Sequence, residues 1–265
     1  MDAGGPSQHD RKGLAAAFGA YIIWGFLPLY LILVQTVPAF EFVGWRIIWT
    51  LPLCLLIALF RKQGGELRAA LGNRRTVGWL ALSASLIAVN WVVYVWAIQT
   101  GEVYAASLGY YINPLVNVLL GTALLGERLT RPQWLAVGIA AVGVSLLAAG
   151  AVTTLWISLT LALTFGTYGL IRKRVVVGSV PGLTIESLLL LLPSIGVVWY
   201  YAQTQGSSFA VSTELSLSIV LGGVLTAVPL LMFAIAARKL PYSMLGFIQF
   251  LAPSIVFILG LTVFD

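Results

Sequence analysis

The sequence predicts an all-α, polytopic helical membrane protein built from two inverted five-helix repeats, of which the tenth helix is missing. Composition is the first observation behind this prediction: of 265 residues, 60% are hydrophobic and 9% are charged, with a mean hydropathy of +0.97. A soluble globular protein carries roughly 25% charged residues, so that class is excluded. The other two observations are the order of the basic residues along the chain and an internal repeat.

Apolar stretches of the length that crosses a bilayer, roughly 20 residues, follow one another along the whole chain. A polar tail, 1–13, precedes the first of them. Proline, glycine or basic residues separate each stretch from the next. We predict spans at about 14–35, 39–60, 77–99, 104–125, 133–150, 154–171, 182–202, 215–237 and 242–264.

Lys and Arg occur in every second gap between these stretches. The gaps around Pro38, Gly101, Gly150 and Ser207 contain none. Because basic loops are held on the cytoplasmic side during insertion, we expect the N-terminus in the cytosol and the Asp265 end outside, in the cell inner membrane. The pattern places one basic residue, Arg46, inside a span. The basic clusters, which can also contact anionic lipid, are Arg11–Lys12, Arg61–Arg75, Arg128–Arg131, Arg172–Arg174 and Arg238–Lys239.

Several short patterns recur in the second half of the chain at an offset of 137 to 141 residues. Ala97-Ile98 is matched by Ala234-Ile235, Trp24-Gly25 by Phe165-Gly166, and Pro114 by Pro253. A constant offset across several helices indicates a duplication. We predict a first repeat at 14–150 and a truncated second repeat at 151–265. A five-span repeat is odd, so the two copies cross the membrane in opposite directions, as in many secondary transporters.

Other classes of protein and site are disfavoured by residues that the chain lacks. The first span is too long for a cleavable signal peptide, and basic residues are not interleaved with aromatics as in nucleic-acid binding. One cysteine, Cys54, and one histidine, His9, provide no metal-ligand set, and no Walker A sequence is present. We therefore expect no metal, no cofactor and no direct use of ATP. An enzyme would need a convergent catalytic group, which the sequence does not offer, so catalysis is not expected.

Polar and aromatic side chains within spans are the candidate solute-binding residues, because polar groups in hydrocarbon are unfavourable. Tyr110, Asn113 and Asn117 share one helix face at spacings of three and four residues. Such groups either bind a small, partly aromatic or zwitterionic solute, or form interhelical hydrogen bonds. The candidates are Trp24, Asn90, Trp91, Tyr94, Tyr110, Tyr111, Asn113, Asn117, Tyr168 and Gln249.

Three charged residues lie clearly within spans: Glu41, Arg46 and Glu186. By helical rise, Arg46 lies about 10 Å below the outer surface and Glu186 about 6 Å from the cytosolic surface, so a direct bridge between them is not expected. Glu41 is expected near the interface and wet. Arg46 either binds a solute carboxylate or serves structure. Glu186 either carries a coupling proton or reaches water at the interface.

Prolines and small residues suggest where helices bend and meet. Pro114 and Pro253 occupy matching places in the two repeats and are candidate hinges, although ordinary helix bending explains a proline equally well. Span five carries small residues that let helices approach closely. This face either contacts the other repeat or a second copy in a homodimer, or simply faces lipid. Its small residues are Ala136, Ala140, Ala141, Ser145 and Ala149.

The segment 106–127, ASLGYYINPLVNVLLGTALLGE, resembles the fourth span of the drug/metabolite transporter superfamily and, within it, the EamA-type carriers. The resemblance extends from about Gly13 to Asp265. It implies ten helices, two cytoplasmic termini, a cavity built from spans one, three, four, six, eight and nine, and transport of small metabolites or drugs. The chain departs from this pattern where it stops after span nine. Supporting motifs are YIIWG (21–25), Asn90-Trp91, FGTYGLIRK (165–173), Ile185-Glu186, Leu192-Pro193 and LGFIQF (245–250).

The predicted function is therefore that of a secondary carrier, most simply an exporter, of small metabolites or drugs by alternating access. Its partners are the solute and the lipid bilayer. The alternatives are a non-transporting membrane sensor or partner protein, or an inactive fragment of a carrier. Saturable movement of a solute would separate a carrier from either alternative.

Overall fold

The computed structural model describes residues 8–150 and 152–263, and within these ranges the chain is a bundle of helices without strands. Nine helical segments there are long and apolar enough to cross a membrane, which confirms the predicted spans. The ninth is divided into two helices. The spanning helices are α1 (Gln8–Leu31), α2 (Ala39–Phe60), α4 (Arg74–Gln99), α5 (Val103–Leu125), α6 (Arg131–Ala149), α7 (Leu155–Arg174), α8 (Ser179–Thr204), α9 (Thr213–Lys239) and the pair α10 (Tyr242–Gln249) and α11 (Leu251–Thr262).

Three local features differ from the predicted spans. Helix α1 begins at Gln8, inside the predicted tail, and a short helix, α3 (Gly64–Gly72), fills part of the basic segment between α2 and α4. The ninth span breaks at Phe250, three residues before Pro253, which cannot donate a backbone hydrogen bond to Gln249. In contrast, α5 runs through Pro114 without a break. The predicted repeat boundary at residue 151 and the predicted location of Asp265 fall outside the described residues.

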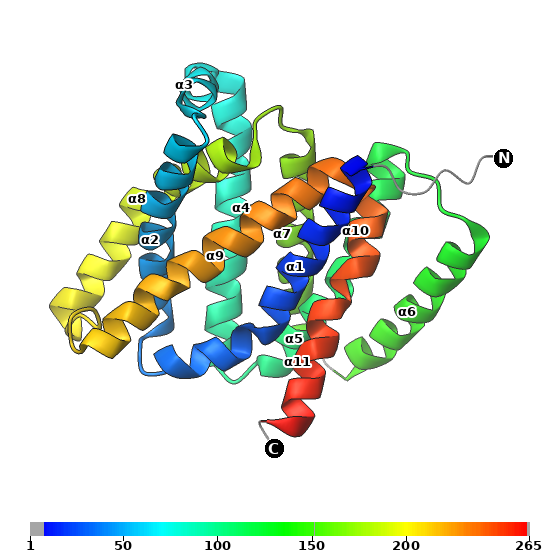
Figure 1. Cartoon of the computed structure of the whole chain (residues 1–265). Helices are drawn as coiled ribbons and strands as arrows, with labels where there is room; N and C mark the ends of the chain where they lie inside the picture. Colours follow the sequence, from blue (N-terminus) through cyan, green and yellow to red (C-terminus); the bar gives the residue numbers. More distant parts are fainter. Residues whose placement is uncertain (1–7, 151, 264–265) are drawn as a thin grey trace.

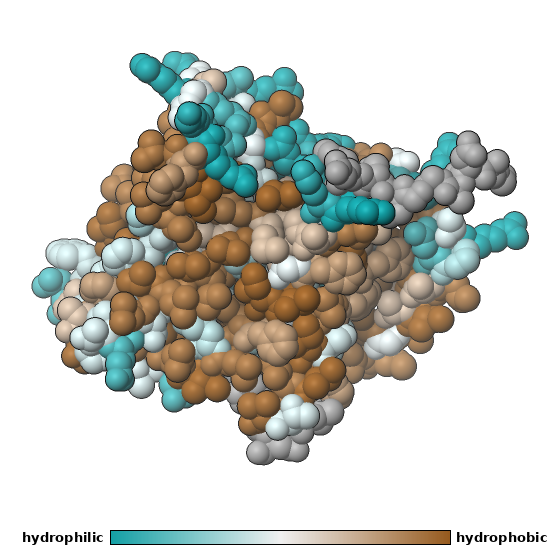
Figure 2. All heavy atoms as spheres, in the orientation of Figure 1, coloured by the Kyte–Doolittle hydropathy of each residue, from teal (hydrophilic) through white to brown (hydrophobic). Residues whose placement is uncertain are grey.

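The two ends of the bundle differ in charge. Figure 1 shows that the α2–α3–α4, α5–α6, α7–α8 and α9–α10 connections all lie at the upper end, together with the start of α1. These connections contain the clusters of Lys and Arg, and we call this end the basic end. In Figure 2, hydrophilic residues gather along the upper edge, and a broad hydrophobic band covers the side of the molecule below it. This distribution is that of a membrane protein with one strongly basic surface.

Helix packing follows a twofold relation between the group α1–α6 and the group α7–α11. Helix α1 packs along α9, and its counterpart α7 packs along α4. Helix α2 packs on α9 as α8 packs on α4, and α5 packs on α7 as α11 and α10 pack on α1. Two contacts, α2 with α8 and α5 with α10, join counterparts directly. This is the pairing expected of an inverted repeat.

Helix α6 stands apart from the rest of the bundle (Figure 1). It packs mainly along α5, and none of its side chains is buried. A capping box, in which Thr130 and Gln133 bond each other's backbone N–H groups, fixes its start. The small residues of α6 therefore remain on the surface, and the homodimer predicted from them stays a prediction.

Candidate functional site

A cavity of about 280 Å³ lies among helices α1, α2, α4, α5, α7, α9 and the α10–α11 pair. Its lining from α1, Tyr21 to Leu31, belongs to the half of that helix farther from the basic end. The lining from α5, residues 106–113, belongs to the first half of a helix that starts at the opposite end. The cavity thus occupies the half of the bundle away from the basic end. The cavity is not fully enclosed, and two residues that line it in this half, Tyr110 and Phe257, are 46% and 61% exposed.

Most of the predicted solute-binding residues line this cavity. They come from four separate parts of the sequence, and helix packing brings them together because each occupies the inward face of its helix. Arg46 and the predicted hinge residue Pro253 also line the cavity. The predicted residues on the cavity wall are Trp24, Asn90, Trp91, Tyr94, Tyr110, Tyr111, Asn113 and Gln249.

Two of the predicted residues, Asn117 and Tyr168, do not line the cavity. Asn117 is fully buried and donates from Nδ2 to Gln249 Oε1 at 2.5 Å, so it holds a lining residue from behind. Tyr168 is 1% exposed, and its ring stacks on Phe233 with 6.1 Å between ring centroids. Pro114 is also buried off the cavity, with its carbonyl oxygen against Gly246. These residues support the cavity and do not face its interior.

Aromatic rings close the cavity toward the basic end, and we call this group the aromatic floor. Trp24 packs edge-on against Phe165 with 5.6 Å between centroids, and Phe165 lies 5.0 Å from Phe233. Tyr21 is 1% exposed and its hydroxyl donates to Gln249 Oε1 at 3.5 Å. Such a cluster excludes water between the cavity and the basic end. The aromatic floor consists of Tyr21, Trp24, Phe165, Tyr168 and Phe233.

Sequence reasoning missed Tyr21 and Phe165 as lining residues. Tyr21 precedes Trp24 by three positions, a spacing that puts both on one helix face, and this signal could have identified it. Phe165 is the repeat counterpart of Trp24, so the internal repeat carried a second signal. Ser107 and Thr226 were also missed, and most of the remaining missed positions, among them Leu27, Pro28 and Phe257, are apolar residues. Nothing in a hydrophobic span separates such residues from those that face lipid.

Arg46 is the one charged residue among the described residues that line the cavity. Its Nε donates to Thr226 Oγ1 on α9 at 2.7 Å. The guanidinium carbon lies 5.3 Å from the centroid of the Trp91 ring and 5.5 Å from that of Phe42. Cation–π contacts and the single hydrogen bond orient the guanidinium at the wall. Within the described chain no acceptor is bonded to its terminal nitrogens, so a carboxylate could pair with two of them.

Two asparagines contribute polar atoms to the wall. Asn90 donates from Nδ2 to the Leu161 carbonyl at 2.8 Å and to Thr164 Oγ1 at 2.9 Å, which ties α4 to α7. Asn113 is 3% exposed, and its Oδ1 has no hydrogen-bond partner among the described residues. A buried amide oxygen without a partner is unfavourable and accepts readily from a ligand N–H.

At the basic end, charged side chains bond to the backbone of neighbouring helices. Glu127, just after α5, accepts hydrogen bonds from the backbone N–H groups of Tyr242 and Ser243 at 2.6 and 2.8 Å and from the Ser243 hydroxyl at 2.6 Å. Lys173 donates from Nζ to the carbonyls of Ala237 and Leu240. Arg238 donates to the Val177 carbonyl at 2.5 Å. These bonds connect α5 to α10 and α7 to α9, and they lie between the aromatic floor and the basic end.

Expectations for three charged residues were wrong: wet surroundings for Glu41, contact with water as one of the two alternatives for Glu186, and a cytosolic loop position for Arg172. Glu41 is not wet: it is fully buried and accepts from Trp45 Nε1, the Ser208 N–H and the Ser208 hydroxyl, because the segment before α9 folds over the start of α2. Glu186 does not reach water at an interface: it is 2% exposed, and Arg172 Nη1 lies 3.6 Å from its Oε1. Arg172, predicted to lie in a cytosolic loop, is itself 1% exposed in the last turn of α7. As expected, Glu186 and Arg46 do not pair.

A helical bundle with nine membrane-crossing segments in its described residues, an inverted repeat and a central cavity lined by apolar, aromatic and a few polar side chains is typical of a polytopic membrane transporter. Comparison with known proteins agrees. A family model described as "EamA-like transporter family" matches residues 11–149, and the chain belongs to this family, within the drug/metabolite transporter superfamily.

Relatives of known sequence extend the match over nearly the whole chain. Protein RarD of Streptomyces exfoliatus is 43% identical over 97% of this chain and 82% of its own length. Protein RarD of Escherichia coli (strain K12) is 37% identical over 99% of this chain and 88% of its own length. The protein named "Chloramphenicol-sensitive protein RarD" of Pseudomonas aeruginosa is 28% identical over 94% of this chain and 84% of its own length. A solved structure titled "Crystal structure of protein" superposes with a TM-score of 0.75 at 20% identity, covering 96% of this chain and 89% of its own, and shares the fold.

Proposed function

We propose that this protein is a secondary carrier that exports a small solute across the inner membrane by alternating access, with the central cavity as its solute site. The observation that carries the proposal is the cavity itself, which reaches the surface at one end and is closed by the aromatic floor at the other. Because basic residues are retained in the cytoplasm, the basic end faces the cytosol, and the cavity opens outward. An outward-open cavity is one of the two states that a carrier needs.

The twofold packing supports the second state. In inverted-repeat carriers, an exchange of conformations between the halves opens the site to the other side. Here the halves are 14–150 and 151–265, and the contacts that would open are those of Glu127, Lys173 and Arg238 at the basic end. Pro253, at the break between α10 and α11, and Pro114, its counterpart, are the proposed hinges.

The lining favours a small solute that carries an aromatic ring and a carboxylate. A volume of about 280 Å³ is close to the lower limit of roughly 300 Å³ for ligand pockets. Tyr94 and Tyr110, 5.7 Å apart at an interplanar angle of 71°, and Trp24 offer faces for ring stacking. Arg46 would pair with the carboxylate, and Asn113 Oδ1 would accept from an N–H group of the solute.

Solute uptake into proteoliposomes tests the proposal. The panel consists of amino acids, aromatic carboxylates and chloramphenicol, the last because it appears in a relative's name. We expect saturable uptake of at least one compound and its loss in Tyr111→Ala, which removes a ring from the cavity wall. Tyr104→Ala is the matched control, because Tyr104 is 51% exposed on the same helix and does not line the cavity. Without saturable uptake of any compound the carrier proposal fails, and the sensor or partner alternative takes its place.

A further inference from the structure

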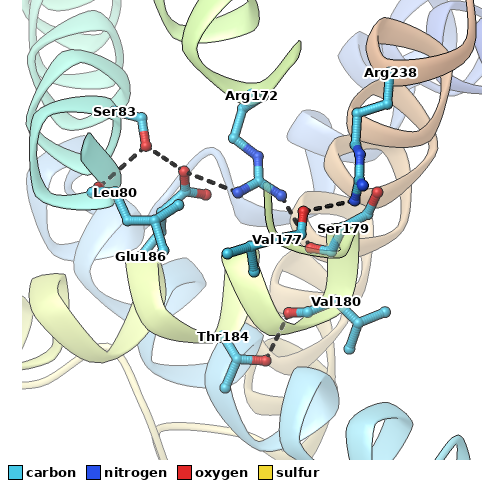
Figure 3. A network of polar contacts seen from close by, with 9 residues as sticks. All are labelled: Leu80, Ser83, Arg172, Val177, Ser179, Val180, Thr184, Glu186 and Arg238. Carbon is cyan, nitrogen blue, oxygen red and sulfur yellow. Dashed lines mark hydrogen bonds and ion pairs between the residues drawn. The ribbon is translucent and has the colours of Figure 1, made fainter. Parts of the chain in front are cut away.

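Glu186 and Arg172 form a buried polar site that the central cavity does not include. Glu186 lies in the second turn of α8, and Arg172 lies in the last turn of α7 (Figure 3). Arg172 Nη1 is 3.6 Å from Glu186 Oε1, and Arg172 Nη2 donates to the Ser179 carbonyl at 3.1 Å. The Ser83 hydroxyl of α4 is hydrogen-bonded to the same Oε1. Three helices thus meet at one carboxyl group.

This site retains unused hydrogen-bonding capacity. Glu186 Oε2 and Arg172 Nε have no hydrogen-bond partner among the described residues, although both atoms are buried. A purely structural ion pair is usually completed by further hydrogen bonds, because a partly satisfied buried charge is unfavourable. The unpaired atoms leave hydrogen-bonding positions that a second arrangement of this site could use.

The Ser83 hydroxyl is placed so that it can serve two protonation states of Glu186. Ser83 Oγ is 3.0 Å from the Leu80 carbonyl and also bonds Glu186 Oε1. A hydroxyl has one proton to donate. When Ser83 donates to Leu80, the proton in the second bond must come from a protonated Glu186. When Glu186 is ionised, Ser83 can turn its proton to the carboxylate. The Ser83–Glu186 hydrogen bond can therefore persist in both protonation states.

A small void lies beside this carboxyl group and shares lining residues with the solute cavity. It measures about 10 Å³, roughly the room that one water needs, and Glu186 lines it. Trp91 and Leu230 line both the void and the central cavity. Trp91 also lies under the Arg46 guanidinium. One layer of side chains therefore separates the Glu186 carboxyl group from the solute cavity.

The other groups around Glu186 offer little alternative for a proton. The titratable groups that interact electrostatically with Glu186 are the Cys54 thiol of α2 and, on α7, the Tyr168 hydroxyl and Arg172. Helix α4 contributes the Ser83 hydroxyl, and α9 contributes Leu230 to the void. The Glu66 carboxylate of α3 is engaged at the start of α8, where it accepts from the Gly178 N–H. Glu186 is the carboxyl group at the centre of this set.

We propose that Glu186 is a proton-binding site that couples solute movement to a proton gradient, with Arg172 as the charge that competes with the proton. In the ionised state the carboxylate pairs with Arg172 and holds α7 against α8. Binding of one proton converts the carboxylate to a carboxylic acid, which releases Arg172 and donates to Ser83. Loss of that proton restores the pair. This inference rests on the proposed carrier function and adds its energy source.

Infrared spectroscopy of the reconstituted protein tests proton binding without a solute. We expect a carboxylic acid C=O band that appears as the pH is lowered across the physiological range and that is absent from Glu186→Gln. Glu41→Gln is the matched control, because Glu41 is a second buried carboxyl group, which is bonded to Trp45 and Ser208 and forms no ion pair among the described residues. The control should keep the band. A Glu186 band present at every pH in that range, or at none, overturns the proposal, because such a group does not exchange protons.

Transport in proteoliposomes tests the coupling. For each compound of the panel, the wild-type protein should show two activities: accumulation driven by a pH gradient, and exchange of labelled for unlabelled solute without one. In Glu186→Gln and Arg172→Gln we expect the driven accumulation to fall at least tenfold. The exchange rate should stay within about twofold of the wild-type rate. Retained exchange shows that these variants fold. Driven accumulation that survives in Glu186→Gln overturns the proton site, whereas the absence of both activities in the wild type overturns the carrier proposal instead.

Discussion

At the basic end of the bundle, charged side chains bond to the backbones of neighbouring helices, whereas contacts at the opposite end leave the cavity open to the surface. Glu127 alone accepts three hydrogen bonds from the start of α10. At the opposite end, Tyr30 donates to the Ser218 carbonyl at 2.8 Å and Tyr104 to the Leu147 carbonyl at 2.9 Å, and one carboxylate, Glu41, accepts from the Ser208 N–H and hydroxyl. These bonds join α1 to α9, α5 to α6, and the start of α2 to the segment before α9. The comparison teaches that opening the basic end requires charged hydrogen bonds to break together.

Of the substitutions proposed here, removal of the Glu127 carboxylate should change the difference between the two ends most. Glu127→Ala leaves three donors without their charged acceptor, and each such bond contributes about 1.5–3 kcal/mol. We expect the basic end to open, which separates α5 from α10. In a Cys54→Ser background, a cysteine at Val118, which is 3% exposed, should react with a maleimide at least ten times faster. A cysteine at Ser107 on the cavity wall should react more slowly.

The matched control for that experiment is Glu102→Ala, since Glu102 lies at the other end of α5 and makes no side-chain capping bond. It should leave both labelling rates unchanged. Equal rates in Glu127→Ala and in the wild type would show that the carboxylate does not hold the basic end closed.

The close approach of α5 and α10 provides a second test. A Cβ at Gly246 would lie 2.8 Å from the Pro114 carbonyl oxygen and 3.2 Å from Asn117 Cβ. Gly246→Val should therefore overpack the closed half and lower the free energy of unfolding by about 1–3 kcal/mol. Thermal unfolding in detergent measures this loss. Gly138→Val on α6, where a Cβ meets nothing within 4 Å, should unfold like the wild type. Similar loss in both variants would contradict a specific close contact.

Substitutions of Arg46 test whether the open half of the bundle binds the solute. Arg46→Gln removes the positive charge from the cavity and should weaken uptake of carboxylate solutes about tenfold, or about 1.4 kcal/mol. Transport of a neutral compound such as chloramphenicol should change less than twofold. Arg46→Lys should recover part of the loss, because an ammonium pairs with a carboxylate but not in the two-point geometry of a guanidinium. Uniform loss for charged and neutral compounds would instead indicate a structural role.

The smallest effect, a small loss of the free energy of unfolding, is expected when a single hydroxyl is removed at the open end. Tyr104→Phe removes an exposed hydrogen bond to the Leu147 carbonyl and should lower the unfolding free energy by about 0.5 kcal/mol. Tyr242→Phe removes a buried bond to the Gly166 carbonyl, 2.6 Å long, and should cost about 1–2 kcal/mol. Thermal unfolding of the pair sharpens the comparison between the ends. The reverse order would show that hydroxyl contacts at the open end matter more.

The spans were predictable because the length of each apolar stretch and the positions of the basic residues can be determined from the sequence. The rotation of each helix about its axis cannot be determined in this way. Arg172 adjoins Lys173 and Arg174, so the three read as one cytosolic cluster, yet Arg172 is 1% exposed and Arg174 is exposed. Glu41 and Glu186 were misplaced for a similar reason. Depth along a helix predicts the distance from an interface but not which neighbours cover the side chain.

The site was predictable where polar groups marked it. Asn90, Asn113 and Arg46 are unusual in hydrocarbon, and all three line the cavity. Asn117 is equally unusual, yet it lies behind Gln249, because residues one helical turn apart can fall on either side of a cavity wall. Tyr21 and Phe165 gave weaker signals, since aromatic residues are common throughout the chain. Sequence identifies which side chains need partners, and packing decides whether the partner is protein or solute.

Helix α6 has a consequence for the membrane in which the protein works. With none of its side chains buried, its orientation depends on lipid more than on other helices. Its 19 residues extend about 28 Å, close to the roughly 30 Å thickness of the hydrocarbon core. A thicker bilayer would have to thin around this helix, and a thinner one would tilt it. Because α6 is attached to α5, which lines the cavity, bilayer thickness becomes a physical input to the solute site.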